Sequence, residues 1–147
     1  MVLKKEVDKF LSNQKSIQFY NNIKIAFSDV LIKMSNKDFR KVTKNLILMV
    51  LHEGAIAQVM HFKLNGKFQV LQLNIPDKAP ISVLRYVITH EFGHVLQGRN
   101  WKESDGSDLE YDAEKFTKKL GFYRTKSIDK WIKKYSSSFE CKLSKLN

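Results

Sequence analysis

The pentapeptide His90-Glu91-Phe92-Gly93-His94 places two imidazoles and a carboxylate at a spacing that can do chemistry. If this segment is helical, residues four apart lie on one face, so His90 and His94 can each offer a ring nitrogen to the same metal ion. Glu91 then lies beside that ion, close enough to hold a water molecule bound to it. Two histidines and a neighbouring carboxylate are the minimal set for metal-assisted hydrolysis.

The flanking sequence predicts that the pentapeptide lies on a helix. Pro80 suits a first helical turn, apolar residues follow at a spacing near 3.6, and Gly98 is a stop signal. We therefore predict a helix over about residues 80–97. The alternative is a buried helix with two structural histidines, but it leaves the acidic Glu91 unexplained on a mostly apolar helix.

A catalytic zinc site needs a third protein ligand and one open position, and Glu110 is the downstream candidate. Residues 107–120 keep helical apolar spacing, with Ser107 as the expected N-cap and Gly121 as the stop. Glu110 and Glu114 are four apart and share a face. Glu110 can reach the metal, and Glu114 can accept a hydrogen bond from the far nitrogen of a ligating histidine.

The sequence leaves two alternatives to Glu110 open. Ser107 and Glu110 have the spacing of a capping box, which would give this carboxylate a structural role. A third histidine ligand would have to come from His52 or His61, because no histidine follows His94. Each of these two histidines is more simply interpreted as an ordinary strand or loop residue.

The two segments together resemble the gluzincin metallopeptidases. His90-Glu91-Phe92-Gly93-His94 followed by Glu110-Tyr111-Asp112-Ala113-Glu114 is similar to their pattern H-E-x-x-H then E-x-x-x-D, and the resemblance covers about residues 68–121. It implies that Glu110 is the third zinc ligand. It also implies that Glu114 takes the place of the acid, usually Asp, that supports a ligating histidine; Glu is one methylene longer.

Two further resemblances concern smaller groups. The string Glu110-x-x-Ala113-x-x-Phe116 is similar to the ImmA/IrrE-type antirepressor proteases, and the chain length resembles that of the minigluzincins, which are stand-alone catalytic domains. The resemblance implies a zincin-like fold, in which a strand before the zinc helix forms the rim of the cleft. We expect residues 68–75 to be that edge strand, with an internal strand of the sheet as the alternative.

These roles predict a zinc metallopeptidase of the endopeptidase type that hydrolyses a protein or peptide substrate. Zn²⁺, held by His90, His94 and Glu110, lowers the pKa of bound water and polarises the carbonyl, while Glu91 takes the water proton and passes it to the departing amine. The sequence does not choose the residue that stabilises the oxyanion. The candidates are Tyr111, Tyr123, Tyr135, His52 and His61.

Length and composition predict one domain over residues 1–147, since 147 residues with 43% hydrophobic content can bury a sizeable core. No apolar run approaches the roughly eighteen residues of a membrane helix, so we expect no membrane partner. Residues 1–12 have no apolar segment typical of a signal peptide. The single cysteine excludes an internal disulfide and fits a reducing compartment, so we expect a cytoplasmic protein.

Charge is unevenly distributed along this chain, whose net charge is +11. Six acidic residues lie in 103–114, where a dication is expected, and eight basic residues lie in 115–134. The basic segment can meet nucleic acid, although a solvated lysine-rich face is the simpler interpretation. Two other functions therefore stay open: a DNA-associated regulatory protease of the antirepressor or crosslink-repair type, and a non-catalytic zinc-binding module of the same fold. The oligomeric state is not indicated.

The remaining segments predict an α+β domain with helices packed on one side of a small sheet. Asn65-Gly66 is a strong hairpin signal, and Ser35 is a predicted helix cap. The elements expected outside the two metal-binding helices are short strands at 16–20 and 23–27, a helix at about 37–51, strands at 55–62 and 67–75, and a short helix near 127–136.

Overall fold

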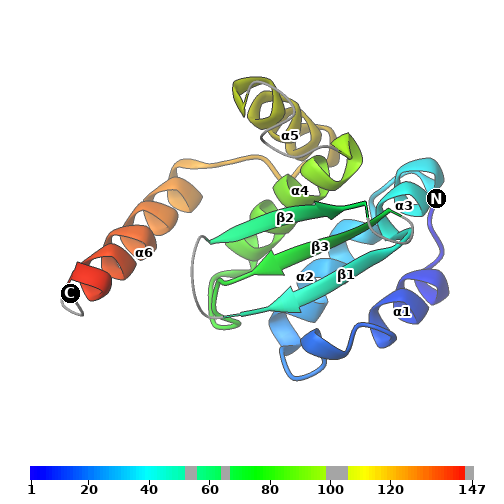
Figure 1. Ribbon diagram of the computed structural model, residues 1–147, viewed down its shortest axis with the longest axis horizontal. Helices are drawn as coiled ribbons and strands as arrows, with labels where there is room; N and C mark the ends of the chain where they lie inside the picture. Colours follow the sequence, from blue (N-terminus) through cyan, green and yellow to red (C-terminus); the bar gives the residue numbers. More distant parts are fainter. Residues whose placement is uncertain (52–55, 64–66, 99–105, 145–147) are drawn as a thin grey trace.

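A small mixed sheet with helices on one face organises the computed structural model, which describes residues 1–51, 56–63, 67–98 and 106–144 (Figure 1). The elements are α1 (Lys4–Ser12), the 3-10 helix η1 (Lys15–Ile17), α2 (Asn21–Ile32), α3 (Asn36–Thr43), β1 (Leu46–Val50), β2 (Ala57–Phe62), β3 (Phe68–Leu73), α4 (Ile81–Gln97), α5 (Gly106–Leu120) and α6 (Lys126–Ser144). The α+β class predicted from the sequence is confirmed. None of the helices in the described part of the chain has the length and apolarity that a membrane crossing requires.

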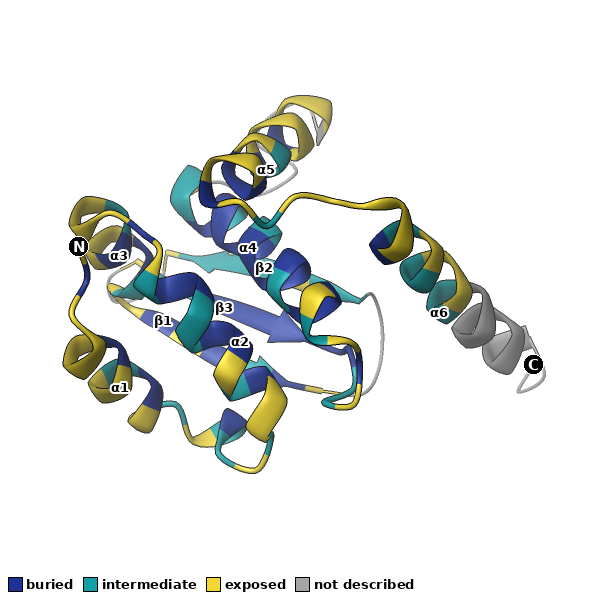
Figure 2. Ribbon diagram, turned by 180° about the vertical axis from the view of Figure 1, so that it is seen from behind, coloured by how far each residue is buried: buried dark blue, intermediate teal, exposed yellow. Residues whose placement is uncertain are grey.

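The strand order is β1-β3-β2, with β1 parallel and β2 antiparallel to β3. Leu48, Leu71 and Val59 stand in one row across the three strands, and the first two are fully buried. Figure 2 shows α2 and α4 lying over this face of the sheet. Alternate side chains therefore point into a core shared with these helices.

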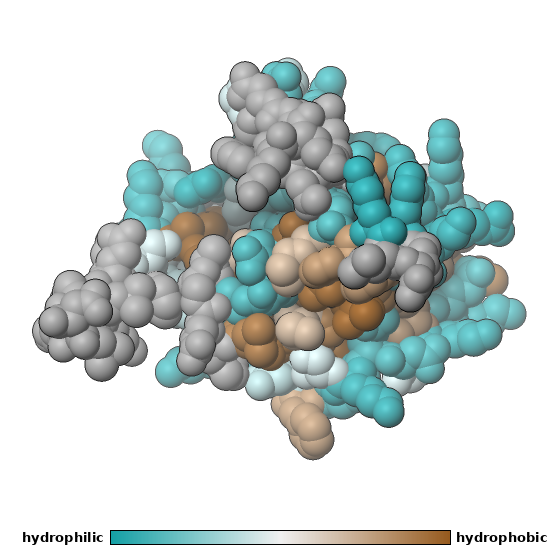
Figure 3. Space-filling view, viewed as in Figure 1, coloured by the Kyte–Doolittle hydropathy of each residue, from teal (hydrophilic) through white to brown (hydrophobic). Residues whose placement is uncertain are grey.

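The opposite face of the sheet carries a second row, formed by Ile47, Val70 and Met60. Ile47 is 46% exposed, and apolar side chains gather on this face in Figure 3. The helices thus cover one side of the sheet, as predicted.

Helix α4 is the central helix of the fold, and ten of its residues are buried. The Phe92 ring lies 5.8 Å from the Phe27 ring of α2, which fixes one side of α4 against its neighbour. The helix begins after Pro80 and ends at Gly98, which adopts the left-handed conformation with φ +66°. The helix predicted over about 80–97 is confirmed, including both of its end signals.

Helix α5 begins at Gly106, so Ser107, the expected N-cap, lies in the first turn of the helix. Its end is as predicted, because Gly121 follows Leu120 with φ +80°. Helix α6 begins close to the predicted position and is longer than the expected 127–136. Its buried residue Ile128 packs against the core.

Three other predictions of secondary structure need correction. The strands expected at 16–20 and 23–27 are wrong, because these residues belong to η1 and α2 and their neighbouring turns. The helix expected over about 37–51 has the predicted cap, since Ser35 Oγ accepts a hydrogen bond from the Asp38 N–H, but it ends at Thr43. Asn45 then takes a left-handed conformation with φ 59°, and the chain continues as β1.

The strands predicted at 55–62 and 67–75 are present as the antiparallel pair β2 and β3. The expected Asn65-Gly66 turn lies outside the described residues. The expectation that residues 68–75 form an edge strand is wrong, because β3 pairs on both sides. In the order β1-β3-β2 the edge strands are β1 and β2.

Candidate metal-binding site

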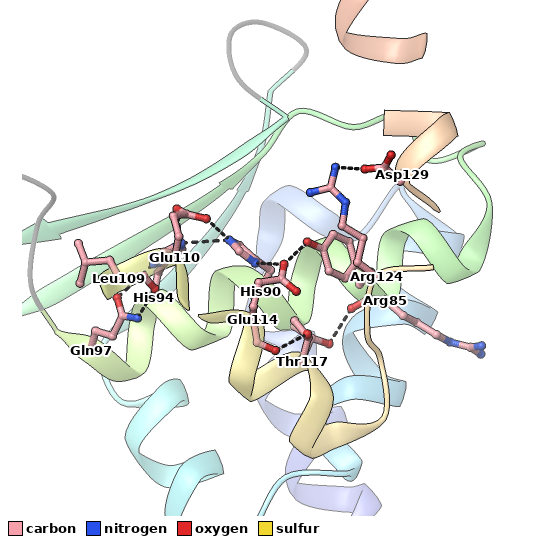
Figure 4. Close-up of polar contacts among 12 residues, drawn as sticks. Arg85, His90, His94, Gln97, Leu109, Glu110, Glu114, Thr117, Arg124 and Asp129 are labelled. Carbon is pink, nitrogen blue, oxygen red and sulfur yellow. Dashed lines mark hydrogen bonds and ion pairs between the residues drawn. The ribbon is translucent and has the colours of Figure 1, made fainter. Parts of the chain in front are cut away.

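Helices α4 and α5 pack directly against each other, and each directs polar side chains toward the same point (Figure 4). On α4 these residues are His90 and His94, one turn apart. On α5, Glu110 and Glu114 are also one turn apart. The i, i+4 spacing in two packed helices therefore brings four predicted site residues together.

Three residues of this cluster place their donor atoms close together. His90 Nε2 lies 3.0 Å from one Glu110 carboxylate oxygen, and His94 Nε2 lies 3.2 Å from the other. The two Nε2 atoms are 3.2 Å apart. His90, His94 and Glu110 are thus close enough to hold a metal ion.

The spacing of these donors fits a tetrahedral ion. Bonds of about 2.0–2.1 Å to nitrogen and oxygen at tetrahedral angles place neighbouring ligand atoms about 3.3 Å apart. The two Nε2 atoms, 3.2 Å apart, are close to this distance, and each lies 3.0 or 3.2 Å from a different oxygen of Glu110. These distances are therefore compatible with a metal ion held by the three residues.

Each of the two imidazoles has an outer hydrogen-bonding partner. His90 Nδ1 lies 3.2 Å from Oε1 of Glu114, and His94 Nδ1 lies 3.1 Å from Oε1 of Gln97. Because both oxygens are acceptors, each Nδ1 can donate to its outer partner, and each Nε2 can then offer its lone pair to a cation. A bound cation would be met by these two lone pairs and the Glu110 carboxylate together; without one, His90 Nε2 lies at hydrogen-bonding distance, 3.0 Å, from Glu110.

Gln97 is a site residue that the sequence analysis missed. Its Nε2 donates a hydrogen bond of 2.8 Å to the Leu109 carbonyl, which leaves its Oε1 as the acceptor for His94. The same side chain thus orients His94 and binds the backbone next to Glu110. Its position three residues after His94, on the same helical face, was the signal available in the sequence.

Tyr86 is the second missed residue, and it lies one turn before His90. Its hydroxyl donates to the same Glu114 oxygen that faces His90. Burial, followed by the hydrogen bond and charge of Glu114, raises the pKa of Tyr86 far above its usual range, so the phenol stays protonated at neutral pH.

Glu91 is buried, with 7% exposure, in the wall of an open pocket of about 320 Å³ that His90 and Glu110 also line. Burial raises its pKa to about 7; the charge of His90 lowers it and that of Glu110 raises it. A carboxylate with a pKa near neutrality can both take up and release a proton at physiological pH.

The charges of the three donors also depend on their surroundings. The hydrogen bond from His90 holds the pKa of Glu110 below its usual value. Burial alone would lower the pKa of His90, but Glu110, Glu91 and Glu114 raise it. Burial lowers the pKa of His94, which favours its neutral form. Glu110 is therefore the anionic member of the set.

The expected oxyanion-stabilising residues lie elsewhere in the described structure. Tyr111 and Tyr123 are exposed, and the Tyr135 hydroxyl donates to the Asn74 carbonyl. Among the described candidates, these three tyrosines and His61 are absent from the pocket lining, whereas Tyr86 and Arg124 belong to it. His52 lies outside the described residues.

The predicted basic segment is partly neutralised by ion pairs. Lys119 Nζ lies 2.9 Å from the Asp38 carboxylate, and Asp129 pairs with both Arg124 and Lys133. The contact with nucleic acid that this segment suggested stays a prediction.

Comparison of the chain with models of protein families, with curated proteins and with solved structures found no match. The resemblance to gluzincins therefore rests on the motif residues quoted above. The structure adds that His90, His94 and Glu110 lie close enough together to hold one ion.

Proposed function

We propose that the protein is a zinc-dependent metallopeptidase of the minimal gluzincin type, with a zincin-like fold. The observation that carries the proposal is the convergence of three lone-pair donors, from His90, His94 and Glu110, beside the buried carboxylate of Glu91. Two imidazoles and one carboxylate form a donor set that zinc uses in catalytic sites, where it keeps a fourth position open.

Each residue has a defined task in this proposal. His90, His94 and Glu110 hold the zinc, which when bound supplies the Lewis acidity that activates water and polarises a carbonyl. Glu91 accepts the proton of the attacking water and delivers it to the departing amine. Its burial suits this task, because its raised pKa of about 7 makes both transfers accessible near neutral pH.

The sheet edge supports a peptide as the substrate. The Asn74 N–H donates to the Ile56 carbonyl, so the main-chain N–H and C=O groups of Ile56 point toward β3. These groups alternate in direction along a strand, so those of Gln58 also point toward β3. Those of Ala57 and Val59 point away from β3. Ala57 also lines the pocket that contains His90 and Glu91. An extended peptide that pairs with this edge passes next to the metal site.

The test combines metal content with proteolysis. Elemental analysis of the purified protein should find one zinc ion per chain, with weaker retention in Glu110→Ala. The Glu91→Gln variant should keep its zinc and lose cleavage of an unfolded protein substrate. Asp112→Asn is the matched control, because this acid is exposed on the same helix as Glu110.

Three outcomes would contradict parts of the proposal. Unchanged zinc affinity in Glu110→Ala would remove Glu110 from the ligand set. Cleavage by Glu91→Gln at the wild-type rate would exclude this residue as the general base. A wild-type protein that binds zinc and cleaves no peptide would instead support the non-catalytic binding module.

A further inference from the structure

A series of side-chain contacts runs from the first turn of α6 to the metal-binding histidine (Figure 4). Asp129 pairs with Arg124 at 2.5 Å, and the Arg124 guanidinium lies over the Tyr86 ring, 5.9 Å from its centre. The Tyr86 hydroxyl donates to Glu114, and Glu114 in turn accepts from His90 Nδ1 at 3.2 Å. Three segments of the chain thus meet behind one imidazole.

The length of Glu114 explains why such a series is needed. A glutamate has one more rotatable bond than an aspartate, so it loses more conformational entropy when it is fixed against a histidine. The Glu114 side chain is also 32% exposed, so water competes for its oxygens. The hydroxyl of Tyr86 binds the same oxygen that faces His90, and it thereby holds the carboxylate in the orientation that orients the imidazole.

Tyr86 is itself held in place. It is 4% exposed on α4, one turn before His90, and the cation of Arg124 packs on its ring. The orientation of Arg124 is fixed by Asp129, which also pairs with Lys133 at 2.8 Å. The Tyr86 hydroxyl is therefore held against Glu114 by a side chain on helix α4 whose own position is fixed by packing. A residue that orients a metal ligand needs to be held in this way.

We infer that Tyr86, held by Arg124, is a positioning residue that sets the metal affinity of the site by fixing Glu114 against His90. This inference rests on metal binding within the proposed function and is independent of whether the protein cleaves peptides. Residues that orient a metal-binding histidine typically change metal affinity about 10- to 100-fold when they are removed.

The first experiment measures zinc affinity by competition with a chelator of known affinity. Tyr86→Phe should weaken zinc binding about tenfold or more. Tyr135→Phe is the matched control, because it removes a phenol hydroxyl that donates to the Asn74 carbonyl and leaves the site untouched. Arg124→Gln should weaken zinc binding less than Tyr86→Phe, because it loosens the ring without removing its hydroxyl.

A double-mutant cycle separates positioning from a general loss of structure. If Tyr86 acts through Glu114, then Tyr86→Phe should have no further effect on zinc affinity in a Glu114→Ala background. In the metal-free protein, side-chain nitrogen shifts of His90 should report a protonated Nδ1 in the wild type. They should report a mixture of tautomers in Tyr86→Phe.

The inference is overturned if Tyr86→Phe binds zinc within twofold of the wild type, or if Tyr135→Phe loses as much affinity. Additive losses in the double mutant, or an unchanged His90 tautomer in Tyr86→Phe, would also overturn it. A wild type that binds zinc without cleaving peptides contradicts the proposed peptidase and leaves this inference standing. A wild type that binds no zinc overturns both.

Discussion

Gly93 and Ala113 lie in direct backbone contact where α4 crosses α5. A Cβ built on Gly93 would stand 2.8 Å from the Ala113 Cα, closer than real Cβ contacts allow. Gly93 is the residue before His94, and Ala113 lies between Glu110 and Glu114. The absence of a side chain at position 93 therefore allows the two carboxylates to reach the two histidines.

The first prediction follows from this contact. In Gly93→Ala, the new methyl group has to push the α5 backbone away, because the nearest atom is backbone and not the end of a flexible side chain. The overpacking should cost about 1–3 kcal/mol, which exceeds the gain of about 1 kcal/mol in helix propensity. The free energy of unfolding and the zinc affinity should both fall.

Denaturant unfolding and chelator competition measure the two effects of this substitution. Ser82→Ala, on the exposed side of the same helix, should leave both nearly unchanged. A Gly93→Ala protein that is more stable than the wild type and binds zinc equally well would show that the two helices are not held at this distance.

A second prediction concerns Gln97, which joins His94 to the Leu109 carbonyl. Gln97→Met keeps the side-chain length but removes both hydrogen bonds, so zinc affinity should fall about tenfold. Gln97→Glu keeps an acceptor for His94 and loses the donor to Leu109, so its affinity should lie between those of the wild type and Gln97→Met. Equal affinities for all three proteins would contradict the bridging role.

The three candidate metal ligands were accessible to prediction because they lie close together in the sequence. His90 and His94 are one turn apart on a helix with clear end signals, and Glu110 is on the next helix. Tyr86 lies four residues before His90, and Gln97 lies three residues after His94. Both are therefore on the same face of the helix, and this spacing indicated them as well. The contact of Arg124 with Tyr86 depends on how α6 packs, and no local sequence pattern indicates it.

The first fifty residues were harder to interpret, for two physical reasons. Ile23, Ile25 and Phe27 alternate as in a strand, but the structure uses the helical pattern of Ile23, Phe27 and Val30, which are buried, and leaves Ile25 51% exposed. The run 46–50 is apolar throughout, which suits a helix or a strand equally. Residues 46–50 form a strand because they pair with β3, and a local sequence pattern does not show such tertiary pairing.

A third prediction concerns pH and the ion pair between Asp38 and Lys119, which ties α3 to α5. Partial burial alone would raise the pKa of Asp38, but Lys119 and Ser35 together lower it below its ordinary value of 3.8. Because the pKa is lower in the folded state, this contribution to stability is fully present above about pH 4 and is lost as the pH falls further.

The measurement compares Lys119→Gln with the wild type by unfolding in the presence of a chelator, so that metal binding does not contribute. At pH 7 the variant should be less stable by up to ~1 kcal/mol, the range of partly exposed ion pairs, and the difference should shrink below pH 4. Lys118→Gln, also exposed on α5, is the control. A difference that grows on acidification would contradict the assignment.

The last prediction tests whether β2 is the strand that receives a peptide. Ala57 directs its N–H away from β3, so Ala57→Pro removes a donor that the sheet does not use, and an edge strand tolerates proline at such a position. Ala57 lines the pocket, whereas Val59 is absent from the described lining. Ala57→Pro should therefore raise the KM for an extended peptide more than Val59→Pro does, while both variants keep their fold and their zinc.

Gln58→Pro, which removes a donor to β3, should instead lower the free energy of unfolding. Equal KM values for the wild type and Ala57→Pro would mean that substrate does not pair with this edge, and that the pocket side chains alone hold it beside the metal.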